Sequence, residues 1–190
     1  MIEKLNSNKT FTQIDFGKIP VAGIEFDDCE FINCNFSNSK LNDTDFLNCR
    51  FVNCNFMMAK TVNTGLKDVT FKGCKLMGFD FSICNDFLFQ VEFEHCQLDY
   101  ALFSKKKMKK TRFANCSIKE ADFSETNLSE AKFDNSDLSG SLFQHCNLEK
   151  TDFRTAINFT IDPENNRMKG ARFSAYSLAG LLSKYGLNIE

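Results

Sequence analysis

The sequence predicts an all-β fold in which the chain winds into a coil of four sides and successive coils stack into a rod. Three observations support this prediction. Large apolar residues recur at every fifth position over about three quarters of the chain. One ring type dominates them, because the 190 residues include 22 Phe but only 3 Tyr and no Trp. Residues 20 positions apart also fall into columns, and one column is phenylalanine throughout.

A period of five residues fits neither a regular helix nor a flat strand. On an α-helix, every fifth residue is rotated by about 140°, so the apolar positions spread around the cylinder. On a flat strand, every fifth residue alternates between the two faces. All central residues point inward only if the chain turns after each pentapeptide, which makes one coil of about 20 residues. Successive coils then pair like neighbouring strands, about 4.8 Å apart.

The phenylalanine column tests the four-sided coil. The five-residue period runs from Phe11 to Phe81, and after a seven-residue step to Leu88 it continues to Phe153. We interpret the step as one side of a coil that carries a two-residue bulge. With that adjustment the column stays phenylalanine through the step, and we expect it to form the core. Its central members are Phe31, Phe51, Phe71, Phe93, Phe113, Phe133 and Phe153. Four of the 22 phenylalanines lie outside the columns: Phe79, Phe87, Phe89 and Phe159.

The nine cysteines follow the same period. Each lies two residues before a central apolar position, in a slot shared with Ala, Ser and Thr, so we expect them to pack as small hydrophobes. Cys34, Cys54 and Cys74 stack in one column, which leaves a metal- or redox-responsive protein as a weaker hypothesis. Against it, parallel inward thiols do not aim at one another, and a straight ladder supplies no tetrahedral shell. Nine free thiols and an N-terminus without a secretion signal favour the cytoplasm.

Composition and motifs exclude several classes of function. The formal net charge of −2 argues against a general nucleic-acid binder, and no stretch approaches the roughly 18 apolar residues of a membrane span. The sequence contains no phosphate loop, nucleotide fingerprint, HExxH motif or serine-nucleophile elbow. A rod filled with rings also has little room for a desolvated pocket. We therefore expect a non-enzymatic protein without a cofactor or metal, which binds neither nucleic acid nor membrane directly.

The repeat unit and the end of the chain resemble known proteins. Strings such as ADFSE, TNLSE, AKFDN and SDLSG resemble the pentapeptide-repeat family, which implies a right-handed quadrilateral β-helix, here of about eight coils. The DPENNR string and the ending LLSKYGLNIE are similar to the gyrase-protecting subgroup, the Qnr proteins with MfpA and McbG. This resemblance implies a DNA-mimicking protein that binds DNA gyrase, a type II topoisomerase, and protects it from quinolones or a peptide toxin. A scaffold for another protein partner is the alternative.

The chain divides into an N-terminal cap, a repeat region and a C-terminal segment. We assign residues 1–10 to the cap and 11–173 to the β-helix. The β-helix carries the bulge near 82–87 and an irregular loop near 158–167. Residues 174–190 form a short α-helix and tail that cover the last coil.

The C-terminal segment has the features of a capped helix with one apolar face. Ser174 suits the N-cap, and Gly186 suits a left-handed stop. In the gyrase-protecting relatives this region also joins two protomers, which implies a homodimer here. The candidate interface residues are Leu178, Leu181, Leu182, Tyr185, Leu187 and Ile189.

Candidate partner-binding residues come from the bulge and from an acidic N-terminal segment. Carboxylates on a rod about as wide as a duplex would suit a DNA-binding saddle, whereas the bulge would project towards a partner. The alternatives are that the carboxylates are ordinary outward polar residues and that the bulge is a tolerated insertion at a corner. The candidates are Glu25, Asp27, Asp28, Glu30, Asp43, Asp45, Asn85, Asp86 and Phe87. The lysine cluster at 105–110 is expected to be a solvated patch, with phosphate or acidic-partner binding as the alternative. Within it, Lys106 falls on an inward slot that normally holds a small residue.

Overall fold

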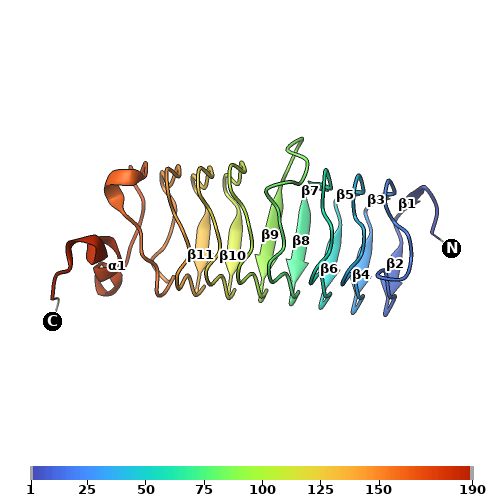
Figure 1. The fold of residues 1–190 in the computed structure, drawn as a ribbon, viewed down its shortest axis with the longest axis horizontal. Helices are drawn as coiled ribbons and strands as arrows, with labels where there is room; N and C mark the ends of the chain where they lie inside the picture. Colours follow the sequence, from blue (N-terminus) through green and yellow to red (C-terminus); the bar gives the residue numbers. More distant parts are fainter. Residues whose placement is uncertain (1, 189–190) are drawn as a thin grey trace.

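The computed structural model describes residues 2–188 and shows a rod of stacked coils whose two chain ends lie at opposite ends of the rod (Figure 1). Its short strands form two parallel sheets. The short sheet runs in the spatial order β1 (Leu5–Ser7), β3 (Glu25–Asp27), β5 (Asp45–Leu47) and β7 (Gly65–Lys67). The long sheet runs in the spatial order β11 (Lys132–Asp134), β10 (Arg112–Ala114), β9 (Val91–Glu94), β8 (Val69–Lys72), β6 (Arg50–Val52), β4 (Glu30–Ile32) and β2 (Thr10–Thr12). No helix within residues 2–188 is long and apolar enough to cross a membrane.

Backbone pairing divides each coil into four sides. Two sides carry the sheets, and the other two are held by single parallel bridges, such as Asn35 with Asn55. Paired residues lie 20 positions apart, or 22 where the loop of residues 82–90 intervenes. On the long-sheet side the ladder continues beyond β11 through Asp152 to Arg172. These spacings define a four-sided parallel β-solenoid, so the fold class predicted from the sequence is right.

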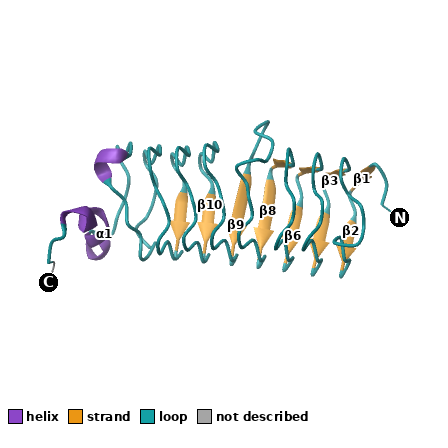
Figure 2. Cartoon of the chain, viewed as in Figure 1, coloured by secondary structure: helices purple, strands orange, loops and turns teal. Residues whose placement is uncertain are grey.

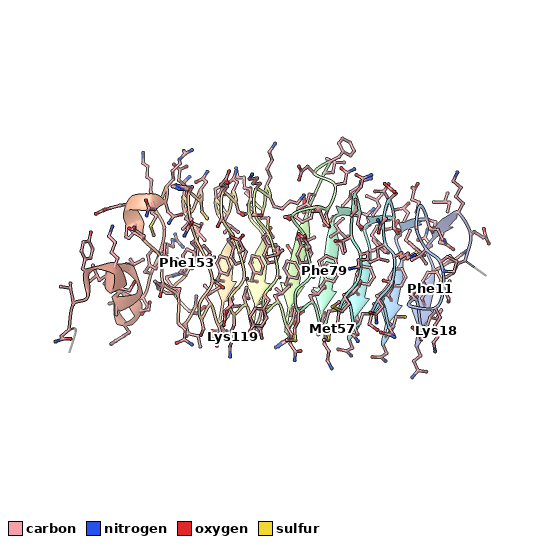
Figure 3. All side chains as sticks on the ribbon, in the orientation of Figure 1. Phe11, Lys18, Met57, Phe79, Lys119 and Phe153 are labelled. Atoms are coloured by element: carbon pink, nitrogen blue, oxygen red, sulfur yellow. The ribbon has the colours of Figure 1, made fainter. Side chains whose placement is uncertain are left out.

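Stacked phenyl rings fill the interior. On the long-sheet side the rings are nearly parallel from Phe11 to Phe173, with centroids 4.7–5.5 Å apart. All seven members named from the sequence, Phe31 to Phe153, are at most 1% exposed. Rings of adjacent sides meet edge to face, as Phe31 and Phe36 do at 5.5 Å and 70°, a favourable aromatic geometry. Figure 3 shows Phe11, Phe79 and Phe153 within the rod.

The corners between sides use residues with left-handed backbone. Asn33 and Asn53, each two positions after a central phenylalanine, have φ of 53° and 54°. Asn tolerates this conformation better than most residues because its short polar side chain bonds locally. The repeated Asn at this position was a sequence signal for the corners that the analysis of apolar spacing missed.

After the loop of residues 82–90, the first side chain that points into the core is not the one predicted. Leu88, expected to be the first inward residue of the second run, is 65% exposed and has φ of 55°. Phe89 is buried in its place, with its ring 6.5 Å from that of Phe81. The prediction for Leu88 is therefore wrong. The physical reason is that re-entry one residue later buries a larger apolar side chain.

The C-terminal end is closed by a succession of single turns. After η1 (Pro163–Asn165) come η2 (Ala175–Ser177), α1 (Ala179–Leu182) and η3 (Ser183–Tyr185), drawn purple in Figure 2. Ser174 accepts a hydrogen bond from the Tyr176 N–H, and Gly186 has φ of 61°. The predicted short helix is present, but only four residues of it are α-helical. An isolated turn of this length is marginal, so docking on the last coil must hold it.

Candidate protein-binding surface

One side of the rod contains most of the charged residues selected from the sequence. Along the rod, this side consists first of the short sheet, which ends at β7, and then of the loop of residues 82–90. Beyond the loop, it continues as a row of single bridges that runs from Lys107 to Arg167. We call the part before the loop the acidic half and the part after it the basic half. The acidic half is defined by Glu25, Asp27, Asp28, Asp43 and Asp45. The basic half is defined by Lys105, Lys107, Lys109 and Lys110.

Strand register brings the acidic half together. Glu25 of β3 pairs with Asp45 of β5, and Asp27 lies on the same strand as Glu25. Asp28 and Asp43 occupy the flanking corners, with φ of 50° and 57°. Alternation along the strands turns these side chains outward, because the intervening residues are buried. Five of the six acidic candidates therefore share one side.

The sixth acidic candidate lies elsewhere. Glu30 belongs to β4 of the long sheet, around the corner from the acidic half, and its carboxylate lies 3.2 Å from the Arg50 guanidinium. The long-sheet side is a ladder of such pairs; for example, Lys72 lies 3.0 Å from Glu94. Its charges are mutually compensated, so Glu30 does not extend the acidic half.

Most carboxylates of the acidic half lack a basic partner. Among residues 2–188, Asp45 is the only one of the five with a cationic side chain within 4 Å, Lys67 at 2.9 Å. Asp43 accepts a hydrogen bond of 2.7 Å from the Asn63 amide. Asp27 has one carboxylate oxygen, Oδ1, that is buried without a hydrogen-bond partner. The surface consequently presents negative charge that is available to a partner.

The loop of residues 82–90 rises from the rod beside the acidic half, above β8 and β9 in Figure 1. Asn85 ties its base to the preceding coil, donating from its backbone to the Thr64 carbonyl and from its side chain to Asn63. The Asn85 side chain also accepts a 2.8 Å hydrogen bond from the Phe87 N–H. Phe87 is 67% exposed, while every other phenylalanine of the chain is buried or partly buried. An exposed ring in such a chain is a candidate contact residue.

Lys106 departs from the expectation of a solvated lysine cluster. Its side chain is 2% exposed, and its Nζ donates to the Cys84 carbonyl and to Asp86 Oδ1, the latter at 2.6 Å. The same ammonium lies 5.2 Å from the centre of the Phe89 ring. The prediction of a solvated patch is wrong for Lys106. Its ammonium can be buried because the loop one coil earlier supplies the hydrogen-bond acceptors, Asp86 and the Cys84 carbonyl.

Three lysines of the basic half, Lys105, Lys109 and Lys110, lie on the surface beside acidic residues of the following coil. Lys109 and Lys110 lie 3.1 and 3.9 Å from Glu130, and Lys105 lies 3.9 Å from Glu125. Exposed pairs of this kind contribute little stability, in the range of about 0–1 kcal/mol. Several lysines of the basic half are thus compensated by acidic neighbours, whereas Asp45 is the one carboxylate of the acidic half with a cationic partner within 4 Å among the described residues.

Comparison with known proteins identifies the family. The family described as pentapeptide repeat region matches residues 24–103 and 86–158, which is more than half of the chain. The chain belongs to the pentapeptide-repeat family. No curated protein matches the sequence.

Solved structures of pentapeptide-repeat proteins share the fold. HetL, from the cyanobacterium Nostoc sp. strain PCC 7120, is described as involved in heterocyst differentiation regulation. It is 14% identical, with 90% of this chain and 84% of that one covered and a TM-score of 0.55. QnrB1, described as a plasmid-mediated fluoroquinolone resistance protein, is 20% identical over 98% of this chain and 97% of that one, with a TM-score of 0.49. At 14% identity the likeness to HetL shows the fold alone.

The small-residue slot of this pentapeptide-repeat protein is a hydrogen-bonding position. Cys49 Sγ donates to the Phe26 carbonyl at 3.4 Å, and Thr126 Oγ1 donates to the Phe103 carbonyl at 2.9 Å in the equivalent place. All nine thiols are free and buried. Burial raises the pKa of Cys49 to about 12 and that of Cys146 to about 11, so both remain protonated at neutral pH. No cluster of three or more metal-ligating side chains occurs within residues 2–188.

The C-terminal cap divides the predicted interface residues into two groups. Leu181 is partly buried and packs on the core, whereas four others are exposed: Leu178, Leu182, Tyr185 and Leu187. Ile189 lies outside the described residues. Tyr176, which the sequence analysis did not select, is fully exposed next to them. The cap therefore presents an apolar surface to solvent while Leu181 anchors it.

Proposed function

We propose that this pentapeptide-repeat protein is a non-enzymatic, cytoplasmic binding protein that occupies the DNA-binding surface of DNA gyrase or a related type II topoisomerase. By doing so it would protect the enzyme from a quinolone or a peptide toxin. The acidic half is the observation that supports this proposal, because four of its five carboxylates have no cationic partner within 4 Å in the described part of the chain. The similarity of the C-terminal strings to the gyrase-protecting subgroup supports it independently.

Charge and shape would act together in this binding. Carboxylates repeated at the coil spacing of about 4.8 Å would face the basic groove that normally receives phosphates, which favours encounter and orientation. Phe87, exposed beside them, would supply an aromatic anchor of the kind that often dominates interface energetics. Asn85 and Asp86 complete the projecting contact.

A supercoiling assay tests this function. The wild-type protein is added to gyrase with and without a quinolone, and recovery of supercoiled DNA is measured. The triple variant Glu25→Gln, Asp28→Asn, Asp43→Asn should need at least about tenfold more protein for equal protection, since charge complementarity is lost. The control Glu92→Gln, Glu120→Gln, Glu125→Gln changes the net charge equally outside the acidic half and should retain protection. Absence of any wild-type effect over a broad concentration range would disprove the proposal.

The exposed apolar surface of the cap supports a homodimer. Leu182→Arg or Leu187→Arg should give monomers in sedimentation experiments, because each places a charge on the surface that a partner would cover. Leu181→Arg is less suitable, since Leu181 packs inward and its loss would disturb the cap itself. A wild-type monomer at high concentration would contradict the dimer.

A scaffold for another protein remains the second candidate. Val62, Ile83 and Leu102 are exposed apolar residues, and such residues suit a protein contact irrespective of DNA mimicry. If gyrase is unaffected, pull-down with wild type and with Val62→Ser/Ile83→Ser would test this function. Capture of a partner that the variant loses would support it.

A further inference from the structure

Lys106 is the only Lys, Arg, Asp or Glu among the buried residues of the described chain. It occupies the small-residue slot, in the same column as Cys84 one coil before and Thr126 one coil after. A buried ammonium is costly unless it is paired and hydrogen-bonded. A lysine in a slot that Thr, Ser, Ala and Cys fill elsewhere therefore calls for a specific set of partners.

All partners of the Lys106 ammonium belong to the projecting loop. Cys84 and Asp86 lie on the limb that leaves the coil, and both accept a hydrogen bond from Nζ. Phe89 lies on the limb that returns, and its ring centre is 5.2 Å from the same atom, within cation–π range. One buried charge thus joins both limbs beneath the exposed Phe87.

Apart from the Lys106 ammonium, few contacts hold the tip of the loop; one of them is the Lys67 ammonium, which lies 5.7 Å from the centre of the Phe87 ring. Phe87 N–H donates to the Asn85 side chain, and the Phe89 N–H donates to the Asp86 carbonyl at a long 3.4 Å. Leu88 has left-handed backbone and an exposed side chain. Without the Lys106 ammonium, these interactions would leave a solvent-exposed segment with few restraints.

We infer that Lys106 is a positioning residue that locks the loop of residues 82–90 in the conformation that projects Phe87. The loop is then a preorganised docking element for a protein partner that offers an apolar pocket next to basic groups. Preorganisation matters because a loose loop must be ordered on binding, which lowers affinity. The partner part of this inference rests on the proposed function, whereas the locking of the loop does not.

Hydrogen exchange and proteolysis test the lock directly. Lys106→Met keeps an unbranched apolar stem but removes the charge, and Lys107→Met changes an exposed neighbour by the same chemistry. We expect exchange of the amides of residues 83–90 and chymotrypsin cleavage after Phe87 to rise at least tenfold in Lys106→Met. Amides of β10 and β11 should keep wild-type rates, and Lys107→Met should match wild type throughout.

A second variant protects the test against simple misfolding. Asp86 is exposed, so Asp86→Asn weakens the lock from the solvent side without disturbing the core, and it should give an intermediate acceleration confined to residues 83–90. Wild-type exchange of these amides in Lys106→Met would overturn the inference. Acceleration spread evenly over all coils would overturn it too, because Lys106 would then be a general core residue.

The functional readout is a double-mutant cycle in the supercoiling assay. Lys106→Met should raise the concentration for half-protection at least tenfold, and should add little once Phe87→Ala is present, since the lock acts through that ring. Independent, multiplicative losses would contradict a positioning role. If wild-type protein has no effect on gyrase, the proposed function fails, but the exchange measurement still decides whether Lys106 locks the loop.

Discussion

The coils before and after the loop of residues 82–90 build the same solenoid with different interiors. Before the loop, phenylalanine dominates three columns and enters the fourth at Phe81, and rings such as Phe36 and Phe46 meet Phe51 edge to face. After the loop, phenylalanine is confined to two columns, and residues such as Leu98 and Ile118 fill the others. The bridges nevertheless keep one 20-residue spacing in both parts. The fold therefore depends on where apolar residues fall rather than on which ones they are.

The exteriors of the same two regions differ more than the interiors. The side that holds the acidic half before the loop holds the basic half after it, although parallel backbone pairing supports both parts. Outward residues of a solenoid make few demands on the fold, so they are free to set its recognition properties. The comparison separates positions that specify architecture from positions that specify partners.

Truncation of a column phenylalanine should have the largest effect and should differ between the regions. Phe113→Ala is expected to lower the free energy of unfolding by about 3–5 kcal/mol, as for other buried rings. Phe51→Ala should fall at the upper end of that range, because Phe51 packs against rings from both adjacent columns. Urea denaturation followed by circular dichroism measures both. A near-neutral effect at either site would show that the column does not carry the stability.

Gly180→Val should be the next most damaging change, and its effect should stay at the C-terminal end. A Cβ at this position would clash with the Phe159 carbonyl oxygen and would lie 2.9 Å from the Phe159 ring. Overpacking of this kind costs about 1–3 kcal/mol, so the cap should detach. Hydrogen exchange should accelerate in the last coils while the coils before the loop keep wild-type rates. Uniform acceleration would mean that the cap stabilises the whole rod.

The sequence predicts most of the interior because the apolar spacing determines which side chains form the columns. The period placed Phe31 to Phe153 in one column, and stacked rings occupy that column in the structure. It could also have separated Glu30 from the acidic half, since a residue directly before Phe31 must lie on the long-sheet side. A count of acidic residues along the sequence does not show this separation.

Tertiary contacts set the features that the sequence could not predict. A two-residue insertion leaves the point of re-entry open, and the choice of Phe89 over Leu88 depends on packing against Phe81. The burial of Lys106 likewise depends on partners 20 or more positions away. The sequence did contain one indication of this burial. Lys106 falls on a position that normally holds a small residue, and a lysine there needs hydrogen-bond partners if it is buried.

Exchange of slot residues between the two regions should have a small effect. Cys49→Thr gives the first region the side chain that Thr126 supplies in the second, and both donate to an equivalent carbonyl. The free energy of unfolding should change by less than about 1.5 kcal/mol, and Thr126→Cys should behave alike. Urea denaturation under reducing conditions measures the change. A large loss for Cys49→Thr alone would indicate that the thiol has a role beyond packing.

Acid should loosen the cap slightly without affecting the coils before the loop. Hydrogen bonds from Lys184 hold the pKa of Asp162 and of Glu164 below their ordinary values, and Tyr185 adds a further bond to Glu164. A lowered native pKa means that this stabilisation is complete above the ordinary pKa of about 4 and is lost as the pH falls through the native values.

Because these groups are exposed and screened, the effect should be the smallest of the four. Tyrosine fluorescence and exchange of the cap amides should change between about pH 4.5 and pH 2.5, and Lys184→Gln should abolish that change. Exchange in the coils before the loop provides the internal reference, since the lowered carboxyl pKa among their described residues is that of Asp15, held mainly by a hydrogen bond from the single neighbour Lys18. If the cap stays docked through this range in both proteins, the close contact of Gly180 with Phe159, rather than the charges around Lys184, holds the end of the solenoid.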